Sequence, residues 1–215
     1  MKDDLDRAIA ELVRWCDQLG IRLSQQAQAQ LQTYVCLILE WNRRVALTGA
    51  RTVREIALHH ILDCLHVAPV LAGGQAVADV GSGAGFPGMP LAIARPDCVF
   101  TLIEPRRKRA TFLRHCIREL GLANASVEEA RVEDLAPTRS GAYNVVVSRA
   151  FAELSSFVRA GLPLLQAGGL LVAMKGPRPE AELQGLPAEV EVARIMRYRL
   201  PEQWGERTLV ILSRR

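Results

Sequence analysis

One stretch, residues 77–88, constrains the fold of this chain more than any other. A short apolar run ends in Asp79 and passes directly into a turn and a helix, with four glycines among the eight residues from Gly81 to Gly88. Glycine lets a turn adopt positive φ and leaves room for a ligand against bare backbone, and the start of a helix offers free N–H donors. The stretch therefore predicts the ligand-binding strand-to-helix turn of an α/β protein.

The same turn matches the dinucleotide pattern G-x-G-x-x-G over residues 83–88, so an NAD-dependent dehydrogenase is a competing interpretation. A tight turn without a ligand is another. Pro87 removes an N–H donor where a pyrophosphate would need one, and Asp79 places a negative charge before the turn. A sulfonium cofactor that carries an ammonium group tolerates that charge better, which favours S-adenosylmethionine over NAD.

The remainder of the C-terminal part alternates short β-rich runs with helical ones, which is typical of βαβ units. We expect strands at 76–80, 99–104, 126–129, 144–148 and 170–175, with helices around 110–120, ended by Gly121, and 154–162. Two later runs, 190–197 and 208–212, are joined through Gly205 and could pair antiparallel. The predicted fold is α/β: a Rossmann-like, doubly wound, mostly parallel sheet with an antiparallel C-terminal hairpin.

The first seventy residues have helical periodicity instead. The signals are an apolar stripe from Leu5 to Leu19, a stop at Gly20, an N-cap at Ser24 and a capping box at 52–55 that starts a helix running to about His66. We therefore expect residues 1–70 to form a helical extension packed on the core, and residues 71–215 to form the cofactor-binding domain.

Composition limits the expected location of the protein, its metal and disulfide content and its partners. The chain has no secretory signal and no apolar run long enough for a membrane span, so a cytoplasmic location without a membrane partner is expected. The five cysteines, Cys16, Cys36, Cys64, Cys98 and Cys116, lack the spacing of a disulfide framework or a zinc site, and we expect five buried thiols and no metal. The net charge of +4 is compatible with a polyanionic partner. Arginine clusters occur at Arg43, Arg44, Arg51 and Arg54, at 106–109, and at Arg194, Arg197 and Arg199.

Polar residues follow several of the predicted strands. Glu104 ends the second strand 23 residues after Gly81, where doubly wound folds place a carboxylate against a ribose diol. Val132 and Glu133 follow the third strand and Arg149 follows the fourth. Because ligands of open α/β sheets bind at the carboxyl edge, these three residues are candidates for the adenine and methionine ends of a cofactor.

Several of these motifs, taken together, resemble the RsmG family, also called GidB. They are the segments 39–48, 60–63, 79–88, 108–109, 148–151 and 175–176, and the resemblance spans about residues 30–212. It implies a class I methyltransferase fold and transfer of a methyl group from S-adenosylmethionine to N7 of a guanine, guanine 527 in the 530 loop of 16S ribosomal RNA. Ala46 and Cys64 depart from the family pattern, which usually has asparagine and serine there.

The resemblance also implies site residues. Cofactor contacts carry over to Gly81, Phe86, Val132, Glu133 and Arg149, and the glycine turn and strand order add Gly83 and Glu104. We assign no catalytic residue, because N7 of a neutral guanine has a lone pair and no proton to lose, so positioning supplies the acceleration. For His60 we expect helix packing or domain docking rather than catalysis.

The basic residues beside the predicted site are candidates for RNA phosphate contacts: Arg106, Arg107, Lys108, Arg109 and Lys175. Ser148-Arg149-Ala150-Phe151 differs from the Asn-Pro-Pro-Tyr type of motif, which disfavours adenine N6 as acceptor. The expected partner is 16S ribosomal RNA within the small ribosomal subunit, with no protein partner predicted. A ribosome- or RNA-binding module with a non-catalytic nucleotide pocket remains an alternative.

Overall fold

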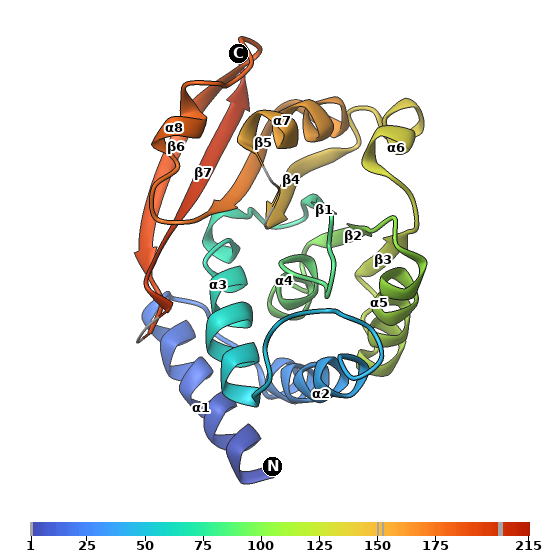
Figure 1. The fold of residues 1–215 in the computed structure, drawn as a ribbon, viewed down its shortest axis with the longest axis vertical. Coiled ribbons are helices and arrows are strands. Elements are labelled where there is room, and N and C mark those ends of the chain that lie inside the picture. The colour runs from blue at the N-terminus through green and yellow to red at the C-terminus, as the bar shows by residue number, and fades with distance from the viewer. Residues whose placement is uncertain (1, 150, 152, 202–203) are drawn as a thin grey trace.

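A computed structural model of the chain describes residues 2–149, 151, 153–201 and 204–215. Its centre is a seven-stranded sheet with the order β3-β2-β1-β4-β5-β7-β6 (Figure 1). The strands are β1 (Ala76–Val80), β2 (Val99–Ile103), β3 (Ala125–Glu128), β4 (Tyr143–Arg149), β5 (Leu165–Lys175), β6 (Val190–Arg199) and β7 (Glu206–Arg214). The first five are parallel, whereas β7 runs antiparallel to both β5 and β6. The predicted fold class, including the antiparallel C-terminal hairpin, is confirmed.

Helices cover both faces of the sheet, because apolar side chains alternate in direction along each strand. Val77, Phe100 and Val147 belong to a buried cluster shared with the N-terminal helices and with α4 (Gly88–Ala94) and α5 (Arg107–Leu120). Ala78 and Val146 point into a second cluster, which is covered by α6 (Val132–Arg139) and α7 (Leu154–Gly161). A short helix, α8 (Glu180–Leu183), precedes β6.

The N-terminal part is helical, as the sequence indicates: α1 (Lys2–Gln18), α2 (Gln25–Trp41), a π-helix η1 (Glu55–Ile61) that continues into α3 (Leu62–Leu65), and a 3₁₀ turn η2 (Ala68–Val70). Ser24 caps α2 by accepting from the N–H of Ala27 at 3.1 Å. The capping box also forms, since Thr52 Oγ1 accepts from the N–H of Glu55 and the Glu55 carboxylate accepts from the N–H of Thr52. Both helix starts are therefore confirmed.

Some boundaries differ from the expectations. Glu104 lies one residue beyond β2, and β5 begins at Leu165 rather than at residue 170. The helices α6 and α8 were not expected, because the first contains Pro137 and the second is a single turn. The expectation of five buried thiols is wrong for Cys36, which is only half-buried on α2, whereas the other four are buried.

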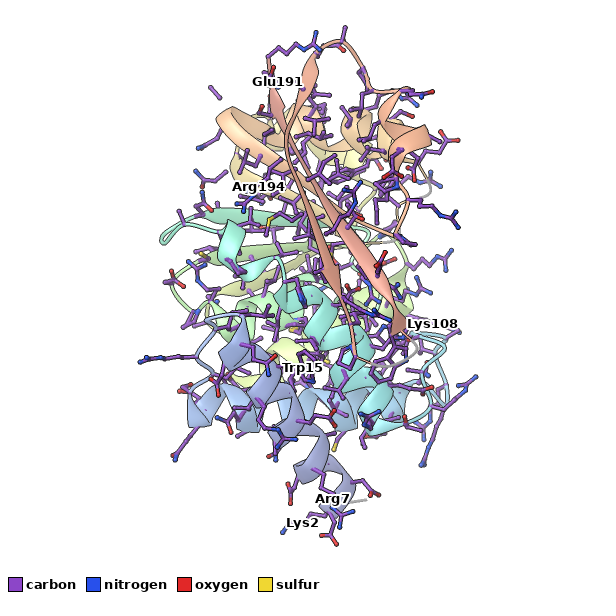
Figure 2. All side chains as sticks on the ribbon, turned by 90° about the vertical axis from the view of Figure 1, so that its left-hand side faces the viewer. Lys2, Arg7, Trp15, Lys108, Glu191 and Arg194 are labelled. Atoms are coloured by element: carbon purple, nitrogen blue, oxygen red, sulfur yellow. The ribbon has the colours of Figure 1, made fainter. Side chains whose placement is uncertain are left out.

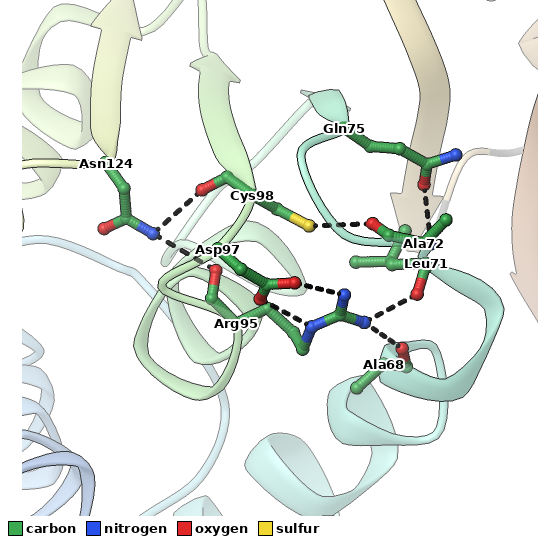
Figure 3. Close-up of polar contacts among 8 residues, drawn as sticks. All are labelled: Ala68, Leu71, Ala72, Gln75, Arg95, Asp97, Cys98 and Asn124. Carbon is green, nitrogen blue, oxygen red and sulfur yellow. Dashed lines mark hydrogen bonds and ion pairs between the residues drawn. The ribbon is translucent and has the colours of Figure 1, made fainter.

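The amino ends of β2 and β3 are fixed by a separate polar network (Figure 3). The Arg95 guanidinium donates to the carbonyls of Ala68 and Leu71 and pairs with Asp97 at 2.7 Å. The Asn124 amide donates to the carbonyls of Arg95 and Cys98. This network lies at the edge of the sheet opposite the glycine turn and fixes the loops there.

Among the helices that the structure describes, none combines the length and the apolar character that crossing a membrane requires.

Candidate cofactor site

The turn after β1 has the positive φ values that its glycines suggest, at Gly81 (75°), Gly83 (59°) and Gly85 (101°). The N–H groups of Gly81 and Ser82 both donate to the carbonyl of Ile103, which fastens the turn to the end of β2. A Cβ at Gly85 would lie 2.7 Å from the hydroxyl of Tyr34. Glycine is thus required here both by backbone conformation and by close approach.

Asp79 is buried beneath this turn at the end of β1. Its Oδ2 accepts from the N–H of Gly88 at 2.9 Å, whereas its Oδ1 has no hydrogen-bond partner among the described residues. Burial raises the pKa of the Asp79 carboxyl to about 7, although the bond from Gly88 lowers it in part. A ligand that brings a positive charge or a donor to this turn would favour the ionised form.

Glu104 and Gly83, both predicted as cofactor contacts, lie against each other. Glu104 Oε2 accepts from the N–H of Gly83 at 2.9 Å, and its Oε1 accepts from the N–H of Arg106 at the same distance. Each carboxylate oxygen retains a second acceptor site, which suits the hydroxyls of a ribose. The second strand therefore delivers a fixed carboxylate to the glycine turn.

Phe86 and Arg149 form the other side of the site. The guanidinium carbon of Arg149, at the end of β4, lies 5.5 Å from the centre of the Phe86 ring. The ring of His60 lies 5.0 Å from Phe86 on another side, and Tyr34 meets Phe86 edge-on at 6.0 Å. Side chains from α2, η1 and β4 thus converge on Phe86 of the glycine turn. Ala150, which follows Arg149 in its sequence motif, lies outside the described residues.

Both ring nitrogens of His60 are engaged. The Arg149 guanidinium donates to Nδ1 at 2.9 Å, so Nε2 carries the proton and donates to Thr48 Oγ1 at 2.8 Å. Burial, together with the charge of Arg149, lowers the pKa of the His60 imidazole to about 3. His60 is therefore neutral at physiological pH and links η1 to β4 and to the loop that holds Thr48.

Arg149 is held from a third direction. Its Nε lies 3.1 Å from Oδ2 of Asp63, a residue of α3 whose side chain is only 3% exposed. The other oxygen of Asp63 accepts from the hydroxyl of Tyr198 on β6 at 2.6 Å. A chain of contacts therefore runs from the C-terminal hairpin through α3 to the carboxyl end of β4.

The remaining cofactor candidates lie at the third crossover. Val132 is buried as the first residue of α6, and Glu133 beside it is exposed. The N–H of Glu104 donates to the carbonyl of Glu128 at 3.0 Å, which places the end of β3 beside the end of β2. Val132 and Glu133 thus begin α6 at the same edge of the sheet as the glycine turn.

The basic candidates for RNA contact have different surroundings. Arg106, Arg107 and Lys108 are exposed at the start of α5. Arg109 is half-buried, and its guanidinium donates to the carbonyl of Ala46 at 2.9 Å. Lys175 pairs with Glu182 at 2.6 Å and its side chain is 9% exposed, so it would have to leave Glu182 to reach a phosphate.

Sequence reasoning overlooked the polar support of the site. Asp63 and Tyr198 are 135 residues apart and belong to no shared motif, so no pattern joins them. Tyr34, whose hydroxyl donates to the carbonyl of Ala84 at 2.6 Å, stands out in the sequence only as part of the apolar stripe of α2. A tyrosine within an otherwise apolar stripe is a usable signal, because a buried hydroxyl needs a partner.

Over most of its length, the chain is similar to proteins of one family. A family model described as "rRNA small subunit methyltransferase G" matches residues 27–210. A protein of Neisseria meningitidis serogroup B named "Ribosomal RNA small subunit methyltransferase G" is 42% identical over 197 residues, which cover 92% of this chain and 94% of that protein. A protein of the same name from Aromatoleum aromaticum is also 42% identical, over 95% of this chain and 98% of its own length.

Solved structures of other proteins have folds similar to that of this chain. TYW2 of M. jannaschii, crystallised in complex with AdoMet, superposes with a TM-score of 0.58 at 15% identity, covering 73% of this chain and 76% of that chain. TrmN of Thermus thermophilus has the same TM-score at 18% identity, covering 81% of this chain and 53% of that chain.

Proposed function

The chain belongs to the rRNA small subunit methyltransferase G family, and from this premise we propose that it methylates N7 of a guanine in 16S ribosomal RNA, at guanine 527 of the 530 loop. Membership makes the chain an S-adenosylmethionine-dependent methyltransferase that acts on the RNA of the small ribosomal subunit. It also removes the dehydrogenase interpretation. The guanine and its N7 atom are the part that we propose.

The residues at the carboxyl edge fit S-adenosylmethionine, which supplies an electrophilic methyl group when bound. Oδ1 of Asp79 has no partner among the described residues and leaves an acceptor beneath the turn, which suits a cationic cofactor. Glu104 would hold the ribose hydroxyls, and Gly81 and Gly83 would let the cofactor approach the backbone. Val132 and Glu133 would border the adenine, while Phe86 and Arg149 would border the methionine end.

The state of His60 is the observation that carries the choice of N7. It is the histidine in contact with Phe86 and Arg149, yet both of its nitrogens are bonded and its pKa is about 3. Such a group is a poor general base at neutral pH. A site whose histidine is unavailable as a base suits an acceptor atom that needs no deprotonation, and N7 of guanine is one. The protein then contributes mainly by placing N7 in line with the methyl group.

The test is transfer of labelled methyl groups from S-adenosylmethionine to 16S ribosomal RNA that lacks this modification, both free and in small subunits. We expect digestion of the RNA to yield labelled 7-methylguanosine from the 530 loop. Label in another nucleoside would contradict the N7 assignment. Binding of the cofactor and RNA without any transfer would instead indicate an RNA-binding module that lacks turnover.

A further inference from the structure

A groove lies outside the cofactor site, between the N-terminal half of α1, the end of α2 and the loop of residues 42–54. Its volume is about 980 Å³. Ala8, Leu39, Ala50 and Val53 contribute an apolar floor. Figure 1 shows the loop as an arc between α2 and α3, and Figure 2 shows Arg7 projecting from the free end of α1. The volume is that of a site for a small organic ligand.

The charge around this floor is predominantly positive. Four arginines line the groove, against the two acids Asp4 and Glu11. Glu11 is already paired with Arg54 at 2.9 Å. Within the part of the chain that the structure describes, the side chains of the other three arginines, Arg7, Arg43 and Arg51, make no hydrogen bond or ion pair.

Exposed arginines elsewhere, such as Arg14 and Arg22, also lack a side-chain partner among the described residues, so what distinguishes the groove arginines is that they are grouped around one apolar floor. Some other surface arginines are paired. Arg95, Arg114 and Arg139 each pair with a carboxylate at 2.6–2.7 Å. Arginines without an internal partner, grouped around an apolar floor, are suited to an anionic ligand that also has a flat apolar part. An unpaired nucleotide has both features, because its phosphate meets arginine and its base lies on apolar side chains.

The groove is joined to the cofactor site by the loop that forms one of its walls. Asn42 holds this loop closed: its amide donates to the carbonyls of Thr48 and Ala50, and its oxygen accepts from the N–H groups of Leu47 and Thr48. Thr48 contacts His60, and Ala46 accepts from Arg109. One side of the loop therefore faces the groove, and the other contacts residues that border the glycine turn.

We propose that this groove is a second RNA-binding site, which holds an unpaired nucleotide of the substrate strand on the far side of loop 42–54 from the methyl-transfer site. Arg43 and Arg51 contact its phosphates, Arg7 flanks them at the outer end, and Leu39 and Val53 contact the base. This inference rests on the proposed function, since it takes ribosomal RNA as the ligand.

The experiment measures binding of protein-free 16S ribosomal RNA to the full chain over a range of salt concentrations. For the double variant Arg43→Glu/Arg51→Glu we expect affinity to fall at least about tenfold, and the dependence of log K on log salt to become shallower by about 1 for each phosphate that the protein no longer neutralises. The affinity for S-adenosylmethionine should be unchanged. The matched control is Arg14→Glu/Arg22→Glu, which makes the same change of charge at exposed residues outside the groove.

A second variant tests the floor without changing charge. Leu39→Trp fills the groove, and it should weaken RNA binding while cofactor affinity and melting temperature remain those of the unchanged protein. Equal losses of affinity in the groove and control double variants would overturn the proposal. So would a loss confined to assembled small subunits, since the groove would then contact a ribosomal protein. Methyl transfer by the unchanged protein separates either result from failure of the proposed function.

Discussion

At the scale of single residues, Asp79 is notable because burial raises the pKa of its carboxyl. It is buried at the end of β1, beneath the glycine turn, with one oxygen bonded to Gly88 and the other without a partner among the described residues. Its pKa of about 7 means that near neutral pH the free protein ionises this group at a cost. A cationic ligand bound at the turn would lower this cost.

This predicts a pH-dependent effect of Asp79→Asn on stability. A carboxyl whose pKa is raised in the folded state, from 3.8 to about 7, stabilises the fold below pH 4 and loses that contribution as pH rises through 7. The asparagine variant does not ionise. Its free energy of unfolding at pH 8 should therefore exceed that of the unchanged protein by about 2–4 kcal/mol, whereas at pH 4 the advantage should vanish. Denaturant titrations at both pH values check this.

The same variant should bind S-adenosylmethionine more weakly at pH 8, because the negative charge is gone. Calorimetry on the proteins used for the unfolding measurements supplies that comparison. An equal change in stability at pH 4 and pH 8 would show that ionisation of Asp79 is not the cause.

The contact between Glu104 and Gly83 was predictable because each residue belongs to a local pattern, whereas the cofactor-binding roles of the site residues stay predictions. Glu104 ends a strand and Gly83 lies in a glycine turn, so the strand order alone brings them together, and they contact each other at 2.9 Å. Asp63 was not predictable as the partner of Arg149. Its role depends on a contact between α3 and β4, and helix periodicity does not determine how a helix is placed against a sheet.

At the scale of elements, the loop between α2 and η1 depends on Asn42. Its side chain satisfies four backbone groups, so it replaces the hydrogen bonds that regular structure would supply. The π-helical turns that follow place His59 and His60 side by side, with ring centres 4.7 Å apart. The order of this loop therefore determines what His60 can contact.

We predict that Asn42→Ala lowers the free energy of unfolding by about 1–3 kcal/mol, because buried loop groups lose their partners. Hydrogen exchange should be faster at the amides of Leu47 and Thr48, and methyl transfer should fall. Arg44→Ala is the control, since the Arg44 side chain is exposed. Unchanged protection at Leu47 would mean that the loop is held by other contacts.

Strands and helix caps were predicted better than element lengths. The runs of apolar residues predicted strands that correspond to β1 to β7, and the capping residues Ser24 and Thr52 predicted two helix starts. Both kinds of signal depend only on residues close together in the sequence. The start of β5 was placed five residues late, since Gly168 and Gly169 interrupt the apolar run. Gly168 has a φ of 74°, and the register of β5 against β4 shifts between Leu165 and Leu170, so an irregular turn of the strand joins its two parts. The division into a helical extension of residues 1–70 and a domain of residues 71–215 stays a prediction.

At the scale of the whole molecule, positive charge is distributed around the carboxyl edge of the sheet. Arg106, Arg107 and Lys108 are exposed where α5 begins, after Glu104 and Pro105. The RNA-binding groove lies on the other side of loop 42–54. A polyanion that reaches the methyl-transfer site would therefore meet basic residues on both approaches.

For Arg106→Glu/Arg107→Glu we predict that RNA affinity falls and its salt dependence becomes shallower by about 1 to 2, because two phosphate contacts are replaced by repulsion. Cofactor affinity should change little. Filter binding against the Arg14→Glu/Arg22→Glu variant separates local contact from net charge. Methylation with an unaltered salt slope would remove these arginines from the RNA interface.

The bond from Tyr198 to Asp63 has a consequence for the order of events during synthesis. Asp63 and Arg149 are translated before Tyr198, so a nascent chain contains the glycine turn and both members of the ion pair before the third member has been added. Full support of Arg149 comes only when the hairpin folds back. The arrangement of the candidate cofactor site thus depends on a residue that is translated after the residues that line it.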